Sequence, residues 1–121
     1  MPKTALELTE EEIRSYKITP PEWHTEERRK KALVIANSIA RTLREDFGAK
    51  RVVAFGSIVE KERFSPWSDI DIAVYGIQSN LFYKAVSASI DISQDFHVDI
   101  VDPEDCSPSL RRSIEKYGIE I

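Results

Sequence analysis

The sequence predicts a single α/β (α+β) domain in which a mixed β-sheet of three or more strands packs against helices. Three segments carry the strand signal, at residues 51–55, 69–75 and 96–102, because their apolar residues form short runs or alternate with polar ones. A helical repeat of apolar residues precedes the first segment, and another helical stretch separates the second from the third. Interleaved strands and helices of this kind indicate one layered domain. A chain of 121 residues is long enough to bury one modest core.

The composition is that of an ordinary soluble protein, with 41% hydrophobic and 31% charged residues. The net charge of −4 argues against nucleic acid as the main ligand. The basic run Arg28–Lys31 is therefore interpreted as a solvated helix face. Cys106 has no cysteine partner for an internal disulfide, which is typical of a reducing cytoplasm. Because no apolar signal core or transmembrane-length run is present, we expect a cytoplasmic protein without membrane association.

We expect residues 1–24 to form an N-terminal arm and residues 25–121 to form the single folded domain. Within the arm, Thr9 and Glu12 have the spacing of a capping box and predict a short helix. Few apolar residues are available there to anchor it to a core.

A long helix precedes the first strand. Pro20 and Pro21 suit a first helical turn, whereas Thr25 is an equally acceptable start, and the sequence does not decide between them. The helix is expected to end near Phe47, because Gly48 is a natural stop. Its core-facing stripe comprises Ala32, Ala36, Ile39, Leu43 and Phe47.

The first two strands carry the chemistry. The apolar strand 51–55 ends abruptly in Gly56 and Ser57, where free backbone N–H groups and a hydroxyl are suited to hold a phosphate. In the second strand, alternation places Asp69 and Asp71 on one face. Two carboxylates this close repel each other unless a cation lies between them. The pattern therefore predicts a site for Mg²⁺ and a nucleoside triphosphate.

The connection at residues 58–68 is predicted to be an irregular loop, with Lys61, Arg63 and Trp67 near its tip. After the second strand, a helix is expected to start at Ser79 or Asn80 and to run to about Ser89.

The third strand, Phe96–Asp102, brings a further carboxylate. Asp99 lies in the middle of an apolar run, on the same face as His97, and is the better candidate for a third metal ligand. Asp102 precedes a proline and is interpreted as a turn residue. His97 is interpreted as structural.

The chain is predicted to end in a short helix and an edge strand. Ser107 is a suitable N-cap before a proline at the first helical position, and Gly118 ends the helix. Its expected inward stripe comprises Leu110, Ile114 and Tyr117, and residues 119–121 are expected to form the edge strand.

Gly56-Ser57, Asp69-Ile70-Asp71 and the later Asp99 resemble, in this order, the signature of the nucleotidyltransferases of the DNA polymerase β superfamily. The short chain looks like the family's minimal (MNT-type) members, single-domain proteins often paired with a helical HEPN protein, several of them as antitoxins. The resemblance covers about residues 51–118. It implies a nucleotidyltransferase-like fold.

The resemblance also implies roles for individual residues. Asp69, Asp71 and Asp99 would be the catalytic carboxylates and would hold two Mg²⁺ ions, for which Mn²⁺ can substitute. Gly56 and Ser57 would hold the phosphates of ATP or another NTP. Ile58 stands where the family often has a basic residue, so Lys61 and Arg63 are expected to help neutralise the triphosphate.

The expected reaction is Mg²⁺-dependent transfer of a nucleoside monophosphate to an acceptor hydroxyl on a partner protein. The expected partner is a HEPN-type helical protein or a second copy of the chain in a homo-oligomer. The alternative is a binding module that neutralises or regulates a HEPN-type partner, with weak or no catalysis. A carboxylate-pair hydrolase fits less well, because two carboxylates on one strand face suit a cation between them.

Overall fold

The computed structural model describes residues 21–121, and the arm predicted at residues 1–24 lies, up to residue 20, outside the described residues. Four strands form one mixed sheet in the order β3-β2-β1-β4. β1 pairs antiparallel with β2 and β4, while β2 and β3 are parallel. The predicted α+β class with a mixed sheet is confirmed. The strands are β1 (Arg51–Phe55), β2 (Ile70–Tyr75), β3 (Val98–Val101) and β4 (Ile119–Glu120).

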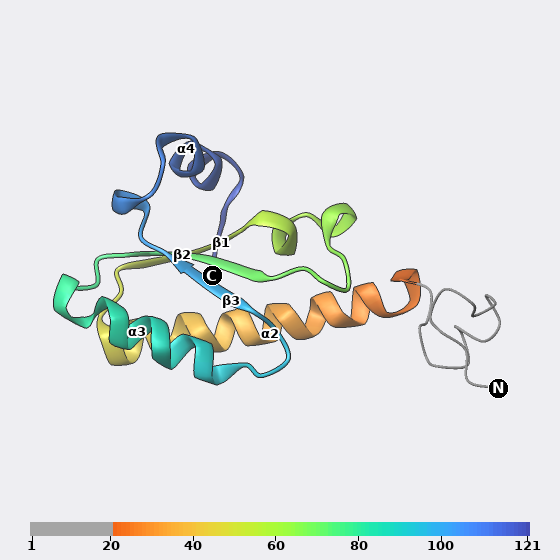
Figure 1. The fold of residues 1–121 in the computed structure, drawn as a ribbon, viewed down its shortest axis with the longest axis horizontal. Helices are drawn as coiled ribbons and strands as arrows, with labels where there is room; N and C mark the ends of the chain where they lie inside the picture. Colours follow the sequence, from red (N-terminus) through yellow and green to blue (C-terminus); the bar gives the residue numbers. More distant parts are fainter. Residues whose placement is uncertain (1–20) are drawn as a thin grey trace, which may run out of the picture.

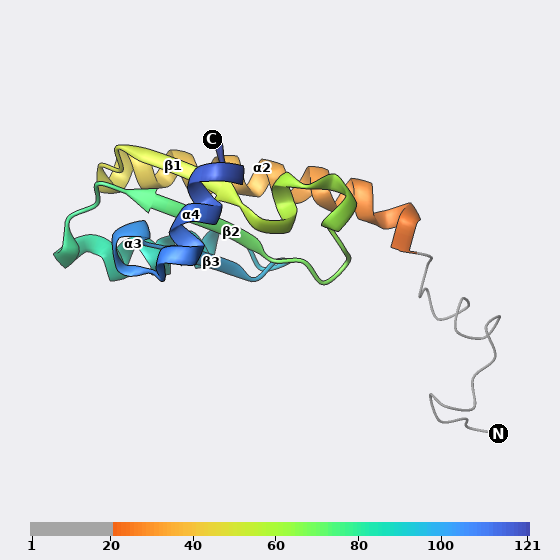
Figure 2. The same ribbon diagram turned by 90° about the horizontal axis from the view of Figure 1, so that it is seen from above.

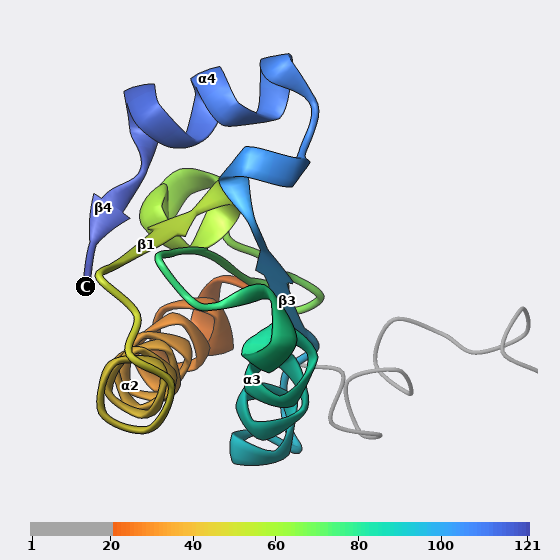
Figure 3. The ribbon, with the colours of Figure 1, turned by 90° about the vertical axis from the view of Figure 1, so that its left-hand side faces the viewer.

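The sheet is covered by helices on both faces (Figure 1). The long helix α2 (Pro21–Phe47) and α3 (Ser79–Ile92) lie side by side on one face, and α4 (Pro108–Tyr117) lies on the other (Figure 3). Viewed from above, α4 lies across the strands (Figure 2). Three short 3₁₀ turns complete the described part of the chain: η1 (Gly56–Val59), η2 (Lys61–Arg63) and η3 (Pro103–Asp105). None of the helices in residues 21–121 has the length and apolar character needed to cross a membrane.

The larger part of the core lies between the sheet and the pair α2 and α3. The even-numbered residues of β1 and β2, together with Val98 and Ile100 of β3, are buried there against the helices. The opposite residues of the same strands form a smaller cluster under α4, which contains Val53, Ala73 and Ile114. Because successive strand residues point to opposite faces, this division fixes which side chains can gather near α4.

The long helix agrees with the first of its two predicted starts, since α2 begins at Pro21. The interpretation of Arg28–Lys31 as a solvated face is wrong for Arg28 and Arg29, which are half-buried, whereas Lys30 and Lys31 are exposed. Arg28 donates to the Asp95 carbonyl and lies over the Phe96 ring, and Lys31 pairs with Asp95. This basic run therefore ties α2 to the loop before β3.

The remaining differences from the expected elements are local. β2 starts one residue later than expected, at Ile70, and β3 is shorter than the predicted 96–102, because only Val98–Val101 pair with β2. Asp102 is a turn residue as predicted, since its carboxylate accepts from the Glu104 N–H. Tyr117, expected to face inward, is 55% exposed, so that prediction is wrong.

Candidate active site

Two of the three predicted carboxylates face each other across neighbouring strands. In the parallel pairing of β2 and β3, Asp71 is the direct partner of Asp99. Directly paired residues point to the same face of a sheet. Asp71 alternates with Ile70 and Ile72 of the larger core, so its side chain points to the α4 face. The strand register therefore brings Asp71 and Asp99 together on one face of the sheet.

Asp69 and His97 immediately precede the first paired residues of β2 and β3. Ile70 is paired with Val98, and its N–H donates to the His97 carbonyl at 2.9 Å. The two residues that precede this pair, Asp69 and His97, therefore stand on neighbouring chain segments at the start of the strands. Asp69 and Asp99 are exposed, whereas Asp71 is half-buried.

The electrostatics of Asp71 show that these groups interact. Burial raises the pKa of the Asp71 carboxyl to about 6, with further contributions from the negative charges of Asp99 and Asp69. His97 acts in the opposite direction and lowers the pKa of Asp71. A half-buried carboxylate flanked by two others is an unfavourable arrangement without a cation. Such a carboxylate is typical of a functional site.

The turn after β1 lies directly against Asp71. Phe55, the last residue of β1, is the antiparallel partner of Asp71, so Gly56 follows immediately beside it. Gly56 has φ of 75°, and a Cβ placed on it would lie 2.6 Å from Asp71 Oδ2. Both the positive φ and the close approach require glycine here. The predicted phosphate turn and the predicted carboxylates thus share one site.

Ser57 begins the 3₁₀ turn η1 together with Gly56 and is half-buried. Its carbonyl accepts from the Glu60 N–H at 3.1 Å, which closes the turn. The first N–H groups of a helical turn have no acceptor within it, and they are therefore available to an anion. The turn forms where the sequence predicted a phosphate cradle.

The structure does not bring Lys61 and Arg63 to the carboxylates. Lys61 Nζ is paired with Glu26 of α2 at 3.6 Å, and Arg63 with Glu60 at 3.2 Å. Both basic side chains are largely exposed, so these ion pairs are weak. Their predicted contact with a triphosphate would require them to leave these partners.

One positively charged residue near the turn was missed by the sequence analysis. Arg29 of α2 is half-buried, and its Nε donates to the Ile58 carbonyl of η1 at 3.0 Å. It thereby links the long helix to the back of the phosphate turn. Arg29 belongs to the basic run Arg28–Lys31, which is a signal in the sequence. Its contact with η1 is seen only once α2 is packed against that turn. His97 was also left out, although it shares a strand face with Asp99.

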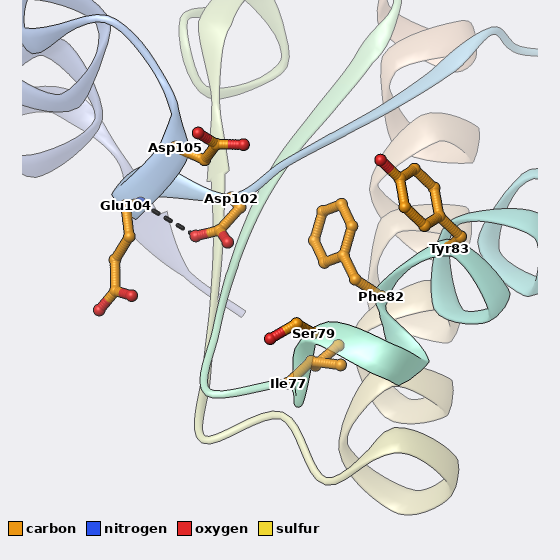
Figure 4. Close-up of a pocket in the computed structure, with 7 residues that line it drawn as sticks. All are labelled: Ile77, Ser79, Phe82, Tyr83, Asp102, Glu104 and Asp105. Carbon is orange, nitrogen blue, oxygen red and sulfur yellow. Dashed lines mark hydrogen bonds between the residues drawn. The ribbon is translucent and has the colours of Figure 1, made fainter.

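A separate hollow of about 260 Å³ lies at the other end of the sheet (Figure 4). Phe82 and Tyr83 of α3 form one side, and Asp102, Glu104 and Asp105 lie across from them. Because β2 and β3 are parallel, this hollow stands at their carboxyl ends, whereas Asp69, Asp71 and Asp99 stand near their amino ends. The hollow therefore lies away from the expected nucleotide site.

The donor set suits a hard divalent cation. Carboxylate oxygens are the ligands that Mg²⁺ prefers in proteins, and it completes its coordination with water and substrate phosphates. Among residues 21–121, no three His, Cys, Asp or Glu side chains stand grouped as a finished metal site. The side chains present fit Mg²⁺ by the chemistry of their donor atoms, and the pairing of Asp71 with Asp99 brings two of them together.

Comparison with known proteins decides the family. Residues 37–121 match the family model described as "Polymerase beta, Nucleotidyltransferase". The chain belongs to the polymerase β nucleotidyltransferase family. This match includes β1, η1, β2 and β3, and so contains every predicted site residue of this nucleotidyltransferase domain.

Solved structures agree with the fold. A mutant of the toxin–antitoxin complex MntA–HepT has a chain with 24% identity and a TM-score of 0.55, over 70% of each chain. The unmodified MntA–HepT complex has a chain with 23% identity and a TM-score of 0.52, over 73% of this chain and 69% of that one. No curated protein sequence matches significantly. The expected nucleotidyltransferase fold is confirmed.

Proposed function

We propose that the protein is a Mg²⁺-dependent nucleotidyltransferase that moves a nucleoside monophosphate from ATP or another NTP to an acceptor hydroxyl on a partner protein. The observation that carries this proposal is the position of Asp71, which is paired with Asp99 on β3 and lies against Gly56 of the phosphate turn. A triphosphate held by the turn would have its reacting phosphorus beside the carboxylates. The family membership supports the same chemistry.

In the proposed reaction, the acceptor oxygen forms a bond to the α-phosphorus while the bond to the pyrophosphate oxygen breaks. Gly56 and Ser57 orient the leaving phosphates. Asp69 and Asp71 would hold the Mg²⁺ that neutralises the triphosphate. Asp99, which is exposed, is placed to accept the hydroxyl proton. Mg²⁺, when bound by these carboxylates, neutralises the phosphates and lowers the pKa of the attacking hydroxyl. Positioning and charge supply most of the catalysis in such transfers.

The proposed acceptor is a HEPN-type partner protein. The solved relatives come from a toxin–antitoxin complex, and one of them carries two aspartate-to-glutamate changes two positions apart, the spacing of Asp69 and Asp71. A partner could dock on the exposed residues around the carboxylates, because α4 covers the sheet further along and leaves Asp99 accessible.

The test is transfer of label from α-labelled ATP to a candidate HEPN-type partner protein, with and without Mg²⁺. The wild type should label the partner, and Asp69→Asn/Asp71→Asn should abolish labelling while leaving complex formation intact. γ-Labelled ATP should give no signal, which separates nucleotidyl from phosphoryl transfer. Asp105→Asn is the matched control, because this carboxylate lines the distant hollow.

Stable complex formation without any Mg²⁺-dependent labelling would instead support the binding module that neutralises its partner. Labelling that persists in the double variant would remove Asp69 and Asp71 from the mechanism.

A further inference from the structure

Trp67 is a large aromatic side chain that lies outside the hydrophobic core. It is 82% exposed, although the other aromatic residues of the same loop and strand end, Phe55 and Phe64, are buried. A packing role is therefore excluded within residues 21–121. Exposed indole surface of this size gains free energy when another flat group covers it.

The turn that carries Trp67 is tightly hydrogen-bonded. The Ser68 N–H donates to the Ser65 carbonyl at 3.1 Å, and the Ser65 N–H donates to Ser68 Oγ at 2.8 Å. The two serine hydroxyls lie 3.2 Å apart, and the Trp67 N–H donates to Ser65 Oγ at 3.3 Å. Pro66 restricts the backbone at the preceding position. None of these bonds uses the indole, so the turn fixes the backbone of Trp67 and leaves its ring uncovered.

This turn borders the candidate active site. Trp67 precedes Asp69 by two residues, so their Cα atoms are at most about 7 Å apart. Two other exposed aromatic residues lie elsewhere. Tyr83 lines the hollow at the other end of the sheet, and Tyr117 ends α4. Of the exposed aromatic rings in residues 25–121, Trp67 is the one next to the carboxylates in the chain. Among the exposed aromatic side chains, Trp67 is therefore the candidate neighbour for a ligand seated on Asp69 and Asp71.

We propose that Trp67 is the stacking surface for the base of the bound nucleotide. This inference rests on the proposed function, because it assumes that the triphosphate is held between the Gly56-Ser57 turn and the carboxylates. The triphosphate would then be held between the Gly56-Ser57 turn and the carboxylates, and the base would extend toward the turn that carries Trp67. Stacking uses the π-face that every base has, so it provides affinity with little hydrogen-bonded selection. The larger face of a purine gains more from it, so purine triphosphates are the preferred substrates.

The experiment compares two ligands that differ by the nucleoside. Affinities for Mg-ATP and for Mg-tripolyphosphate are measured by calorimetry on the wild type, Trp67→Ala and Trp67→Phe. Removal of the ring should weaken Mg-ATP by about tenfold or more and leave Mg-tripolyphosphate unchanged. Trp67→Phe should keep most of the affinity for Mg-ATP, because it retains an aromatic face.

Fluorescence gives a second readout that does not depend on a substitution at position 67. Trp23 and Trp67 are the only tryptophans of the sequence, so Trp23→Phe leaves Trp67 as the single reporter. Mg-ATP should quench its emission, and Mg-tripolyphosphate should not.

Equal affinities of the wild type and Trp67→Ala for Mg-ATP would overturn the inference, as would an equal loss for both ligands. Loss of partner binding with unchanged Mg-ATP affinity would assign Trp67 to a protein interface and would likewise overturn it. If the wild type binds Mg-tripolyphosphate and Trp67→Ala binds Mg-ATP as tightly as the wild type does, the stacking inference fails but the proposed function stands. If the wild type binds neither ligand, both proposals fail.

Discussion

Asp71→Asn should stabilise the ligand-free protein while abolishing its transferase activity. The carboxylate of Asp71 is half-buried and repelled by Asp69 and Asp99, and its pKa is raised to about 6 from 3.8. Each pKa unit corresponds to about 1.4 kcal/mol, so the full shift is worth about 3 kcal/mol. Because the group is partly exposed, solvent screening reduces this to about 1–1.5 kcal/mol. The amide is nearly isosteric and carries no charge.

The pH dependence follows from the direction of the shift. A carboxyl whose pKa is raised in the folded state favours folding while it is protonated, and this advantage is lost as pH rises from about 4 through about 6. The free energy of unfolding of the wild type relative to Asp71→Asn should therefore decrease over this range and stay low above it. Urea denaturation at about pH 4, 5, 6 and 7.5 measures the difference across this range.

At pH 7.5 (roughly 1.5 units above the folded-state pKa), Asp71→Asn should be the more stable protein, with a melting temperature about 5 °C higher. Asp105→Asn, an exposed aspartate at the opposite end of the sheet, is the matched control and should change stability little. Equal stability of Asp71→Asn and the wild type at all pH values would refute the strained arrangement of carboxylates.

Three further predictions concern the same site. Gly56→Ala should destabilise the fold by about 1–3 kcal/mol and remove activity, because its Cβ meets Asp71 and φ is positive; chemical denaturation and the labelling assay measure both, and an unchanged variant would contradict the geometry. Arg29→Met should lower the free energy of unfolding by about 1 kcal/mol and raise KM for ATP, because it loosens the turn at Ile58. Arg41→Met on the exposed face of α2 should do neither, and equal effects of the two changes would deny Arg29 a positioning role. Mg-ATP at about 100 times its Kd should stabilise the protein by about 2.7 kcal/mol in thermal denaturation, and no shift at millimolar concentration would argue against an intact site.

Much of this fold could be predicted from the sequence, because the strands carry strong local signals. β1 is buried along nearly its whole length, and its predicted bounds, Arg51–Phe55, are those of the structure. The edge strand at Ile119 and the Ser107 cap of α4 were also predicted and are confirmed, since the Ser107 hydroxyl accepts from the Leu110 N–H. In these segments, local preference and tertiary packing favour the same conformation.

The candidate site was predictable for a related reason. Asp99 interrupts an apolar run, so its position indicated a role before its neighbour was known, although the structure leaves its side chain exposed. Alternation placed Asp69 and Asp71 on one face, but the sequence did not contain the register that pairs Asp71 with Asp99. That register depends on the packing of the complete sheet.

The errors arose where contacts distant in sequence decide the outcome. Arg29 looked like a solvated residue because its acceptor, the Ile58 carbonyl, is 29 positions away. Tyr117 fitted the helical stripe of α4, but the last turn of this helix extends beyond the small cluster around Ile114, so the ring stays exposed. The periodicity of apolar residues predicts which face of a helix is buried. How much of that face is covered depends on the elements packed against it.

The account depends on one site that combines the carboxylates with the phosphate turn, and a crystal structure with Mg²⁺ and a non-hydrolysable ATP analogue tests this most directly. We predict a metal ion ligated by Asp69 and Asp71, with Asp99 beside it, and phosphates on the backbone N–H groups of Gly56 and Ser57. A nucleotide bound at another surface, or a metal ion held without Asp71, would contradict the account.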